Sequence, residues 1–550
     1  MKRGMFRSTA LLTATFALFA FGCGQEPKSD AQNSGAADPV PSSATAEPEP
    51  ATAVRPPDIQ INFDVDARRP ATLLSDYGLF ENLAEQTLIA GVIPYQLNSL
   101  SYVDGARQES FVYIPHGEVA SYQPDNAFTF PVGSILIQNL WFPADSDDTL
   151  QQKRLFETRL LLHMTKGWTA VPYVWNESGT DADRVVIGQK SQVTRASSAG
   201  DPHTFTYLTP NMNECKSCHV NEDVMDPIGV TAANLNRTIS VDGTDVNQLH
   251  YWKQIGLLNG LPDDRNSIPS IPDWTDDASA TLERRARSWL DVNCSHCHNP
   301  RGAASTSGLD LTFNQSQPVR FGVYKPPVAA GRGSQGLKFS ILPQKPDESF
   351  LVRRMNSTEL GVMMPPLGRT TVDHRGVDLI RQWISGMEVD EALAEAALNP
   401  MKAYKDAVNG GDPELGMTLF HKTQKCLTCH RIGSEGGSIG PNLSDVGKRV
   451  KRDYMLESIV DPSAKIVKGF ETWVFVLADG RVITGTIVSE DEYEVVVGHE
   501  GKQSKIQKDE IDERLASTVS VMPTQANLLT VEDVRNLIAY LSTLQETPQP

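Results

Sequence analysis

The sequence predicts a multidomain α+β protein, with a β-rich, sandwich-like N-terminal domain followed by two mostly α domains. Three observations predict this organisation in a chain of 550 residues. Short runs of alternating apolar and polar residues dominate 56–277, which is typical of strands. Helical periodicity takes over in 278–390 and in 408–546, which a linker at 391–407 separates. A strand-like stretch at 470–503 interrupts the last segment and predicts a β-hairpin insertion.

The first 22 residues have the pattern of a secretory signal. Lys2 and Arg3 begin a basic segment, and an apolar run follows at 10–21. This run is too short to span a bilayer comfortably and is flanked as signal peptides are. We therefore expect export from the cytoplasm and removal of residues 1–22.

Cys23 stands where a lipid anchor would be attached. The preceding FAFG resembles a bacterial lipobox, although Ala20 and Phe21 replace the usual residues. We expect a periplasmic lipoprotein held to the membrane through Cys23, with plain secretion as the alternative. Residues 23–55 are rich in Ala, Pro, Ser and Glu, so they cannot bury enough apolar surface to fold and are predicted to form a disordered linker.

The other six cysteines form one pattern three times. The chain has seven cysteines, and all but Cys23 lie in CKSCH at 215–219, CSHCH at 294–298 and CLTCH at 426–430. Cys-x-x-Cys-His is the attachment pattern of c-type haem, in which both thiols bond the porphyrin and the histidine binds iron. A zinc site needs four ligands, usually two such pairs at a set spacing, and a disulfide or a redox dithiol needs no histidine. The predicted thioether residues are Cys215, Cys218, Cys294, Cys297, Cys426 and Cys429, and the predicted proximal ligands are His219, His298 and His430.

Two helices are predicted to bracket the third motif. Asp412 and Pro413 form the start of one helix, and the Thr530–Asp533 capping box variant starts the other. Gly416 and Tyr540 would let the two helices cross closely. This is the plan of a class I cytochrome c, so we expect a cytochrome c domain at 408–546.

The same domain offers both axial ligands of its haem. A carbonyl of GPNL at 440–443 can accept a hydrogen bond from His430, and the thioether of Met522 can reach the other side of the iron. The domain resembles the haem-binding domain common in Planctomycetes and Verrucomicrobia through CLTCHRIGSEGGSIGPNLSDVGKR, YMLESIVDPSAKIVKGFETW, DGRVITG and SVMP. That resemblance implies a c-type haem with His430 and Met522 as its axial pair.

The middle segment repeats this logic as a second cytochrome c-like domain. A helix predicted over 282–290 leads into CSHCH, and SGLDL follows, as in a family of planctomycete-type cytochromes. Met363 and Met364 precede two prolines and a closing amphipathic helix. We expect Met364 to be the distal ligand, with Met363 as the alternative, and we interpret His296 as a solvent-facing spacer.

The first motif follows the last predicted strand of the N-terminal domain and has no Met-Pro segment before a closing helix. The candidates for its sixth ligand are His163, Met164, His203, Met225 and His250. We select Met164, and an open iron is the alternative. From about residue 74 through the middle domain the chain resembles an exported bacterial haem protein family of unassigned function, through segments such as LSDYGLF, GWTAVPYVWN, PNMNECKSCH and PIGVTAANLNR.

The charge and the motifs together favour electron transfer. The formal net charge of −18 argues against nucleic-acid binding and fits redox partner proteins with basic docking patches. A haem with protein ligands on both faces relays single electrons. We therefore expect an exported trihaem c-type cytochrome that carries electrons between periplasmic partners. The alternatives are a peroxidase-like oxidoreductase with an open first haem and the cytochrome subunit of a dehydrogenase.

Overall fold

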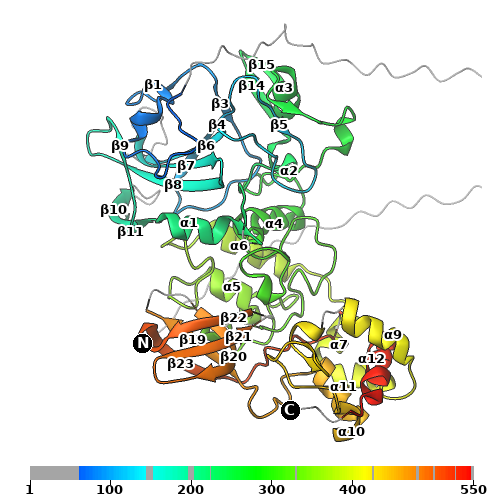
Figure 1. The fold of residues 1–550 in the computed structure, drawn as a ribbon. Coiled ribbons are helices and arrows are strands. Elements are labelled where there is room, and N and C mark those ends of the chain that lie inside the picture. The colour runs from blue at the N-terminus through cyan, green and yellow to red at the C-terminus, as the bar shows by residue number, and fades with distance from the viewer. Residues whose placement is uncertain are drawn as a thin grey trace, which may run out of the picture. The chain divides into compact units, whose positions relative to one another are not determined.

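The computed structural model describes residues 61–143, 153–195, 203–222, 224–328, 331–423, 426–478, 482–499, 502–526 and 528–546. These residues form a mixture of helices and strands with several separate sheets, which confirms the mixed class predicted from the sequence (Figure 1). The predicted signal, Cys23 and the linker at 23–55 lie outside the described residues.

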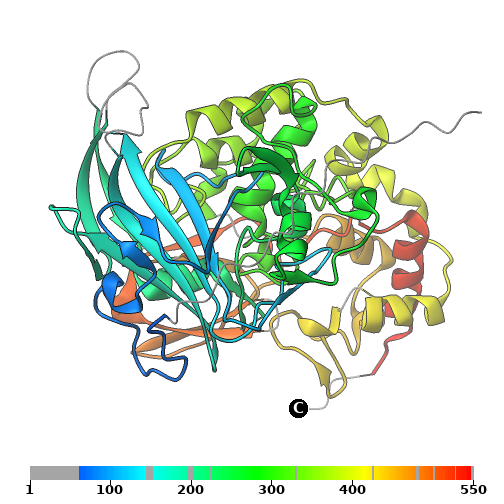
Figure 2. The same cartoon turned by 90° about the horizontal axis from the view of Figure 1, so that it is seen from above.

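A six-stranded antiparallel sheet is the centre of the N-terminal part. Its order is β3-β4-β6-β7-β8-β9, and its strands twist strongly when seen from above (Figure 2). Residues alternate between the two faces of each strand, so Leu160 and Leu162 of β7 enter one core and Leu161 enters another. The strands are β3 (Val92–Tyr95), β4 (Arg107–Tyr113), β6 (Ile135–Pro143), β7 (Lys153–Met164), β8 (Gly167–Trp175) and β9 (Ala182–Arg184).

The two faces of this sheet have different covers. The face of Leu160 packs on Leu74 and Tyr77 of the short helical turn η1 (Leu74–Tyr77). The face of Leu161 packs on α2 (Ala232–Leu235) and α3 (Gln248–Gln254). The sequence predicted a sandwich-like domain, and on this face two helices and the segments around them cover the sheet. The other sheets of this part are two-stranded among the described residues: β1 (Phe80–Asn82) with β2 (Thr87–Leu88), β5 (Ala120–Ser121) with β16 (Leu258–Asn259), β10 (Gln189–Arg195) with β11 (His203–Thr209), β12 (Val220–Asn221) with β13 (Val224–Met225), and β14 (Thr238–Val241) with β15 (Thr244–Asn247).

The named elements of the middle part are helices and short helical turns. The helix expected over 282–290 is present as α4 (Leu282–Leu290), with the Thr281 hydroxyl as its N-cap. It packs with α5 (Phe350–Met355) and α6 (His374–Ser385) around a core that contains Trp289 and Ile380. The sequence predicted α4 and α6, because apolar residues recur at helical spacing in both, and it did not predict α5.

Hydrogen bonds tie the N-terminal part to the middle part. The buried Asp104 carboxylate accepts bonds from the backbone nitrogens of Thr370 and Thr371, each at 2.8 Å from Oδ1. The backbone nitrogen of Tyr102 donates to Asn293 Oδ1 at 2.7 Å. These contacts join residues far apart in sequence, and the regular patterns that predict helices and strands do not reveal them.

The C-terminal part has the two crossing helices that the sequence predicts. They are α9 (Pro413–Thr418), capped by Asp412, and α12 (Val531–Thr543), which begins with the Thr530–Asp533 capping box. A Cβ on Gly416 would lie 2.0 Å from the carbonyl oxygen of Asn536, so only glycine fits at this crossing. The other helices of this part and of the preceding segment are α7 (Glu391–Leu398), α8 (Pro400–Ala403), α10 (Val446–Arg449) and α11 (Arg452–Val460).

The insertion between these helices is larger than the predicted hairpin. It is a five-stranded antiparallel sheet in the order β22-β21-β20-β19-β23. β19 and β20 do pair as predicted, and the residues that join them, 479–481, lie outside the described residues. The strands are β19 (Thr472–Leu477), β20 (Val482–Glu490), β21 (Glu494–His499), β22 (Lys502–Gln507) and β23 (Ile511–Ser517).

Candidate functional site

The first Cys-x-x-Cys-His motif lies on α1 (Met212–His219). Asn211 and Glu214 form a capping box that starts this helix directly after β11. The histidine at its end is held by a backbone contact, because His219 Nδ1 lies 2.8 Å from the carbonyl oxygen of Asp226. A carbonyl can only accept, so Nδ1 carries the proton and Nε2 is left with its lone pair.

The second motif closes a helical turn after α4. A π-helical turn, η4 (Asp291–Ser295), follows α4, and the backbone nitrogen of His298 bonds the carbonyl of Cys294 at 2.9 Å. His298 Nδ1 lies 2.9 Å from Ser307 Oγ. The Ser307 hydroxyl donates its own proton to the carbonyl of Ala304 at 2.7 Å, so its oxygen accepts from the imidazole. The second histidine is therefore held in the same tautomer as the first.

The third motif has the contact that the sequence anticipated. His430 Nδ1 lies 2.9 Å from the carbonyl oxygen of Pro441, in the GPNL segment, which confirms that prediction. A Cβ on Gly440 would lie 2.9 Å from two atoms of the His430 ring, so the loop approaches the imidazole closely because glycine stands there. Metal-binding histidines are commonly held in this way through their second nitrogen.

Burial favours the neutral forms of the three motif histidines and of the first cysteine in each motif. It lowers the pKa of His219 and of His430, and it lowers the pKa of His298 to about 4. It also raises the pKa of the first thiol in each motif, to about 11 for Cys215 and Cys426 and to about 12 for Cys294. The six cysteines of the three motifs form no disulfide in the part of the chain that the structure describes.

The first and second motifs meet. Ligand atoms of Cys218, His296 and Cys297 all lie within 4.8 Å of one another. His296 is not the solvent-facing spacer that the sequence suggested. Its ring is partly buried, and its Nδ1 is enclosed without a hydrogen-bond partner among the described residues. A spacing pattern within one motif carries no information about a second motif that packs against it.

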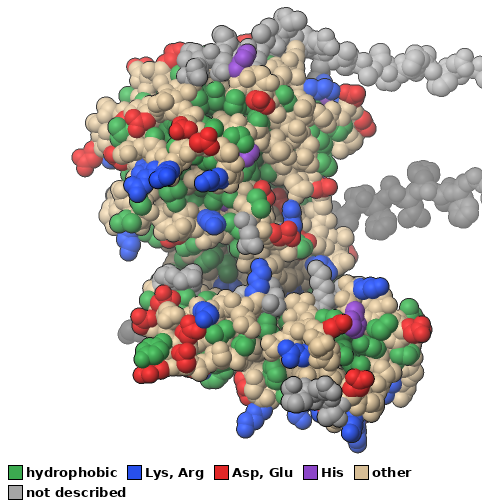
Figure 3. Space-filling view, in the orientation of Figure 1, with side chains coloured by type: hydrophobic (Ala, Val, Ile, Leu, Met, Phe, Trp, Pro, Cys, Tyr) green, Lys and Arg blue, Asp and Glu red, His purple; other side chains and the backbone are tan. Residues whose placement is uncertain are grey.

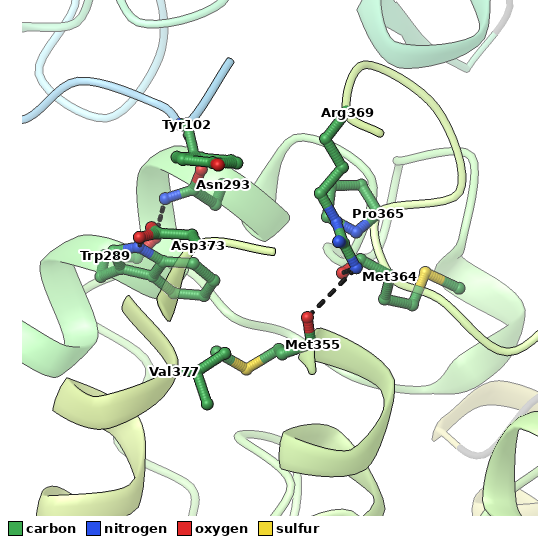
Figure 4. A pocket seen from close by; sticks show the side chains of 9 residues that line it. All are labelled: Tyr102, Trp289, Asn293, Met355, Met364, Pro365, Arg369, Asp373 and Val377. Carbon is green, nitrogen blue, oxygen red and sulfur yellow. Dashed lines mark hydrogen bonds between the residues drawn. The ribbon is translucent and has the colours of Figure 1, made fainter. Parts of the chain in front are cut away.

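Met364 lies in a loop that is fixed close to the second motif. Arg369 Nη2 donates to the carbonyl of Met364 at 2.8 Å and to that of Met355 at 3.2 Å (Figure 4). A cavity of about 10 Å³ lies beside this loop, and it is large enough for only about one water molecule. The Met364 side chain extends away from Trp289 and Asp373 (Figure 4), while Met363 is buried.

Two cations, the partly buried Arg354 and the buried Lys325, accompany the second motif. Arg354 donates to the carbonyl of Val362 at 2.9 Å, and Lys325 is 8% exposed and lies against Gly308, next to Ser307. Burial lowers the pKa of Arg354 to about 10 and that of Lys325 to about 8. Neither forms a salt bridge within the described residues, although buried charges are normally paired. The sequence analysis missed both, because burial of a single lysine or arginine leaves no periodic signal.

The structure does not bring Met164 to the first motif. Met164 is 8% exposed in the core on the Leu160 face of the sheet, whereas Cys215 packs against the core on the Leu161 face. His163 alternates onto the Leu161 face, where its ring stacks on Trp168 at 4.3 Å. The selection of Met164 therefore has no geometric support, since alternation alone did not reveal which face the motif would cover.

The other candidates for a sixth ligand are scattered. Met225 lies on the hairpin that also carries Asp226, on the Nδ1 side of His219. His250 is on α3 and contacts Asn247 Oδ1 at 3.1 Å. The side chain of His203 lies outside the described residues. Met522, whose backbone nitrogen bonds Ser520 Oγ at 3.1 Å, is described, and its role as a ligand of the third haem stays a prediction.

The residues present fit a c-type haem at each motif. Each motif offers two thiols without a disulfide and an imidazole whose Nε2 is free to bind a metal. The second site adds two cations, Lys325 and Arg354, that suit an anionic group. A scan against protein-family models and a search of curated proteins both found no match. No helix in the described part of the chain is long and apolar enough to cross a membrane.

Proposed function

We propose that this chain is an exported trihaem c-type cytochrome that transfers electrons between periplasmic redox partners. The observation that carries the proposal is the hydrogen bond at Nδ1 in all three Cys-x-x-Cys-His motifs, from His219 to Asp226, His298 to Ser307 and His430 to Pro441. Three separate loops provide the acceptor for Nδ1. Repetition of one fold therefore does not explain why the three histidines share a tautomer.

A bound haem supplies a one-electron iron couple, and the residues of the chain hold and tune it. The cysteines attach the porphyrin, and the imidazoles bind through Nε2. The Nδ1 acceptors fix the ring orientation and raise the basicity of each ligand. In the second site, the buried Lys325 and the partly buried Arg354 would be suited to pair with the haem propionates, because neither has a carboxylate partner among the described residues.

The domain plan belongs to the same proposal. A β-rich unit at 56–277 would carry the first haem, and cytochrome c-like domains at 278–390 and 408–546 would carry the second and third. The crossing of α9 and α12 at Gly416 supports the last of these. The resemblance of that segment to the Planctomycetes and Verrucomicrobia haem-binding domain, and the resemblance of the preceding part to exported haem proteins, stay predictions.

A haem enzyme is the second proposal, and one observation favours it. Met164 packs on the sheet face opposite Cys215, so its placement does not support it as a distal ligand of the first haem. An open first iron would allow peroxidase-like chemistry, with the other two haems feeding electrons to it. A dehydrogenase partner would instead leave this chain as the cytochrome subunit of a larger complex.

The proposal also covers location and partners. We expect a processed N-terminus at Cys23 with a lipid anchor, a periplasmic location and redox partners with basic patches. Acidic and basic side chains are interspersed over the face in Figure 3, so the excess of negative charge is not gathered into one patch there. Mass spectrometry of the N-terminal peptide from a native host would distinguish a lipidated Cys23 from plain secretion.

The test is to count covalent haems and to determine their spin states. The protein is matured in a host with a haem-attachment system, and the haem content is measured by pyridine haemochrome absorbance and intact mass. We expect three covalent haems, each lost when its two cysteines are replaced by alanine. Three low-spin EPR signals would favour the carrier, and a high-spin signal that depends on His219 would favour the enzyme. A protein that attaches no haem, and holds zinc at the cysteines instead, would contradict both proposals.

A further inference from the structure

The second cysteine of the first motif lies beside the second cysteine of the next motif. Cys218 Sγ, Cys297 Sγ and a ring nitrogen of His296 lie within 4.8 Å of one another. The two cysteines are far apart in sequence and belong to different parts of the chain. This cluster is the one place among the described residues where three histidine, cysteine or carboxylate ligand atoms lie this close together.

Backbone contacts behind the two motifs fix this approach. Asn221 forms an antiparallel bridge with Gly302, and the backbone nitrogen of Glu222 donates to the carbonyl of Arg301 at 3.1 Å. A Cβ on Gly302 would lie 2.4 Å from the carbonyl oxygen of Cys297, so the turn after the second motif needs glycine to close. The loops that follow the two motifs are thus paired directly.

A second set of contacts holds the other end of the second motif. Asn293, which directly precedes Cys294, accepts the backbone N–H of Tyr102 at 2.7 Å and donates to the carbonyl of Trp289 at 2.9 Å. Ser99 Oγ and Ser288 Oγ lie 2.9 Å apart between the same two parts. With contacts on both sides of the motif, the approach of Cys218 to Cys297 is part of a packed interface.

We propose that the first two haems form a close pair whose porphyrin edges meet at Cys218 and Cys297, with the His296 ring against both. The inference rests on the proposed function. A thioether sulfur is attached to the porphyrin through the carbon of a former vinyl group, so two such sulfurs a few ångströms apart would bring the two porphyrin edges near each other. The His296 ring lies beside both sulfurs and is partly buried.

The pair would pass one electron directly between its members. The ferrous iron of one haem is oxidised to ferric as the ferric iron of the other is reduced to ferrous, and no atom or proton needs to move. The placement assigns the first two haems to one redox unit, whereas the third motif stands outside the cluster. The chain would then work as a two-haem unit plus a single haem rather than as three equivalent steps.

The experiment measures magnetic relaxation between haems in the oxidised holoprotein. EPR power saturation is recorded for wild type, for a Cys215→Ala/Cys218→Ala variant that lacks the first attachment site, and for a matched Cys426→Ala/Cys429→Ala variant that lacks the third. A paramagnetic neighbour speeds relaxation. We expect the power needed to saturate the second haem signal to fall several-fold in the first variant and to stay at the wild-type value in the control.

A titration of wild type covers the case in which the first variant does not fold. The protein is poised at successive potentials, and the signal of either haem in the pair should saturate more easily while its neighbour is reduced and diamagnetic. Signals that saturate independently of one another, in a protein that carries three covalent haems, would overturn the pair and leave the cytochrome proposal standing. A protein without covalent haem would overturn both.

Discussion

A single hydrogen bond recurs at the three motif histidines, but its acceptor differs. His219 and His430 bond backbone carbonyls, whereas His298 bonds the hydroxyl of Ser307. Only the last acceptor can be removed by substitution without moving the main chain. Ser307 is therefore the residue at which the role of this hydrogen bond can be tested.

Replacing Ser307 with alanine removes the acceptor and leaves a buried Nδ1–H unpaired. Such a loss costs about 1–3 kcal/mol, so we expect the holoprotein to unfold at a lower denaturant concentration. The midpoint potential of the second haem should rise, because a less basic imidazole stabilises ferric iron less well. The measurements are denaturant unfolding and a spectroscopic redox titration. Ser305→Ala, on the same turn, is the control, and equal potentials in the two variants would refute the role assigned to Ser307.

Met164 gives a prediction about the first haem. Its thioether packs in the core on the Leu160 face of the sheet, away from Cys215. We expect Met164→Leu to keep the spin state and absorbance of every haem, at a cost below about 1.5 kcal/mol in stability, because the volume is conserved. Loss of a low-spin EPR signal in this variant would show that Met164 binds iron after all. Met522→Leu, at the third haem, is the comparison in which we do expect a change of spin state.

At the scale of elements, Gly416 decides how closely α9 and α12 cross. Two effects oppose each other when it is replaced by alanine. Helix propensity favours alanine by about 1 kcal/mol. The new Cβ would lie 2.0 Å from the Asn536 carbonyl oxygen and 2.8 Å from Tyr540 Cβ, and such overpacking typically costs about 1–3 kcal/mol or more.

The clash is with backbone, which has no room to move, so we expect Gly416→Ala to destabilise the C-terminal part. Thr418→Ala, at an exposed site on the same helix, should change stability by about 0.5 kcal/mol or less. Thermal unfolding followed at the absorbance of the third haem is the measurement. A Gly416→Ala protein that is as stable as Thr418→Ala would mean that the two helices separate readily.

Across the whole molecule, the sequence predicted features that depend on neighbouring residues, but it did not predict contacts between distant segments. The sequence predicted the helix caps at Asp412 and Thr530 and the helix at 282–290, because caps and apolar spacing involve residues that are close together in the chain. The sequence also predicted the hydrogen-bond acceptor of His430, because GPNL follows the third motif closely. The meeting of Cys218 with Cys297, and the contacts of Asp104 with Thr370 and Thr371, depend on tertiary packing between segments that no periodicity links.

The sheets show the same division. Alternation in 470–503 predicted the pairing of β19 with β20, but β23 joins beside β19 from beyond that stretch and makes a five-stranded sheet. In β7, His163 and Met164 lie on opposite faces of the sheet, and the face that the first motif covers is set by where α1 packs. A period of two places alternate residues on opposite faces of a strand, but it does not predict which face a later helix packs against.

The net charge gives the last prediction, which concerns the molecule as a whole. A formal charge of −18 should attract a cationic redox partner over distances comparable with the screening length, about 8 Å at 0.15 M salt. We expect the second-order rate of electron transfer to a cationic small cytochrome, measured by stopped flow, to fall steeply as ionic strength rises. An acidic electron carrier of similar size is the control, and its rate should rise with salt because repulsion is screened. If both partners respond alike, the charge serves solubility alone, and the partner is recognised by contacts that do not depend on long-range attraction.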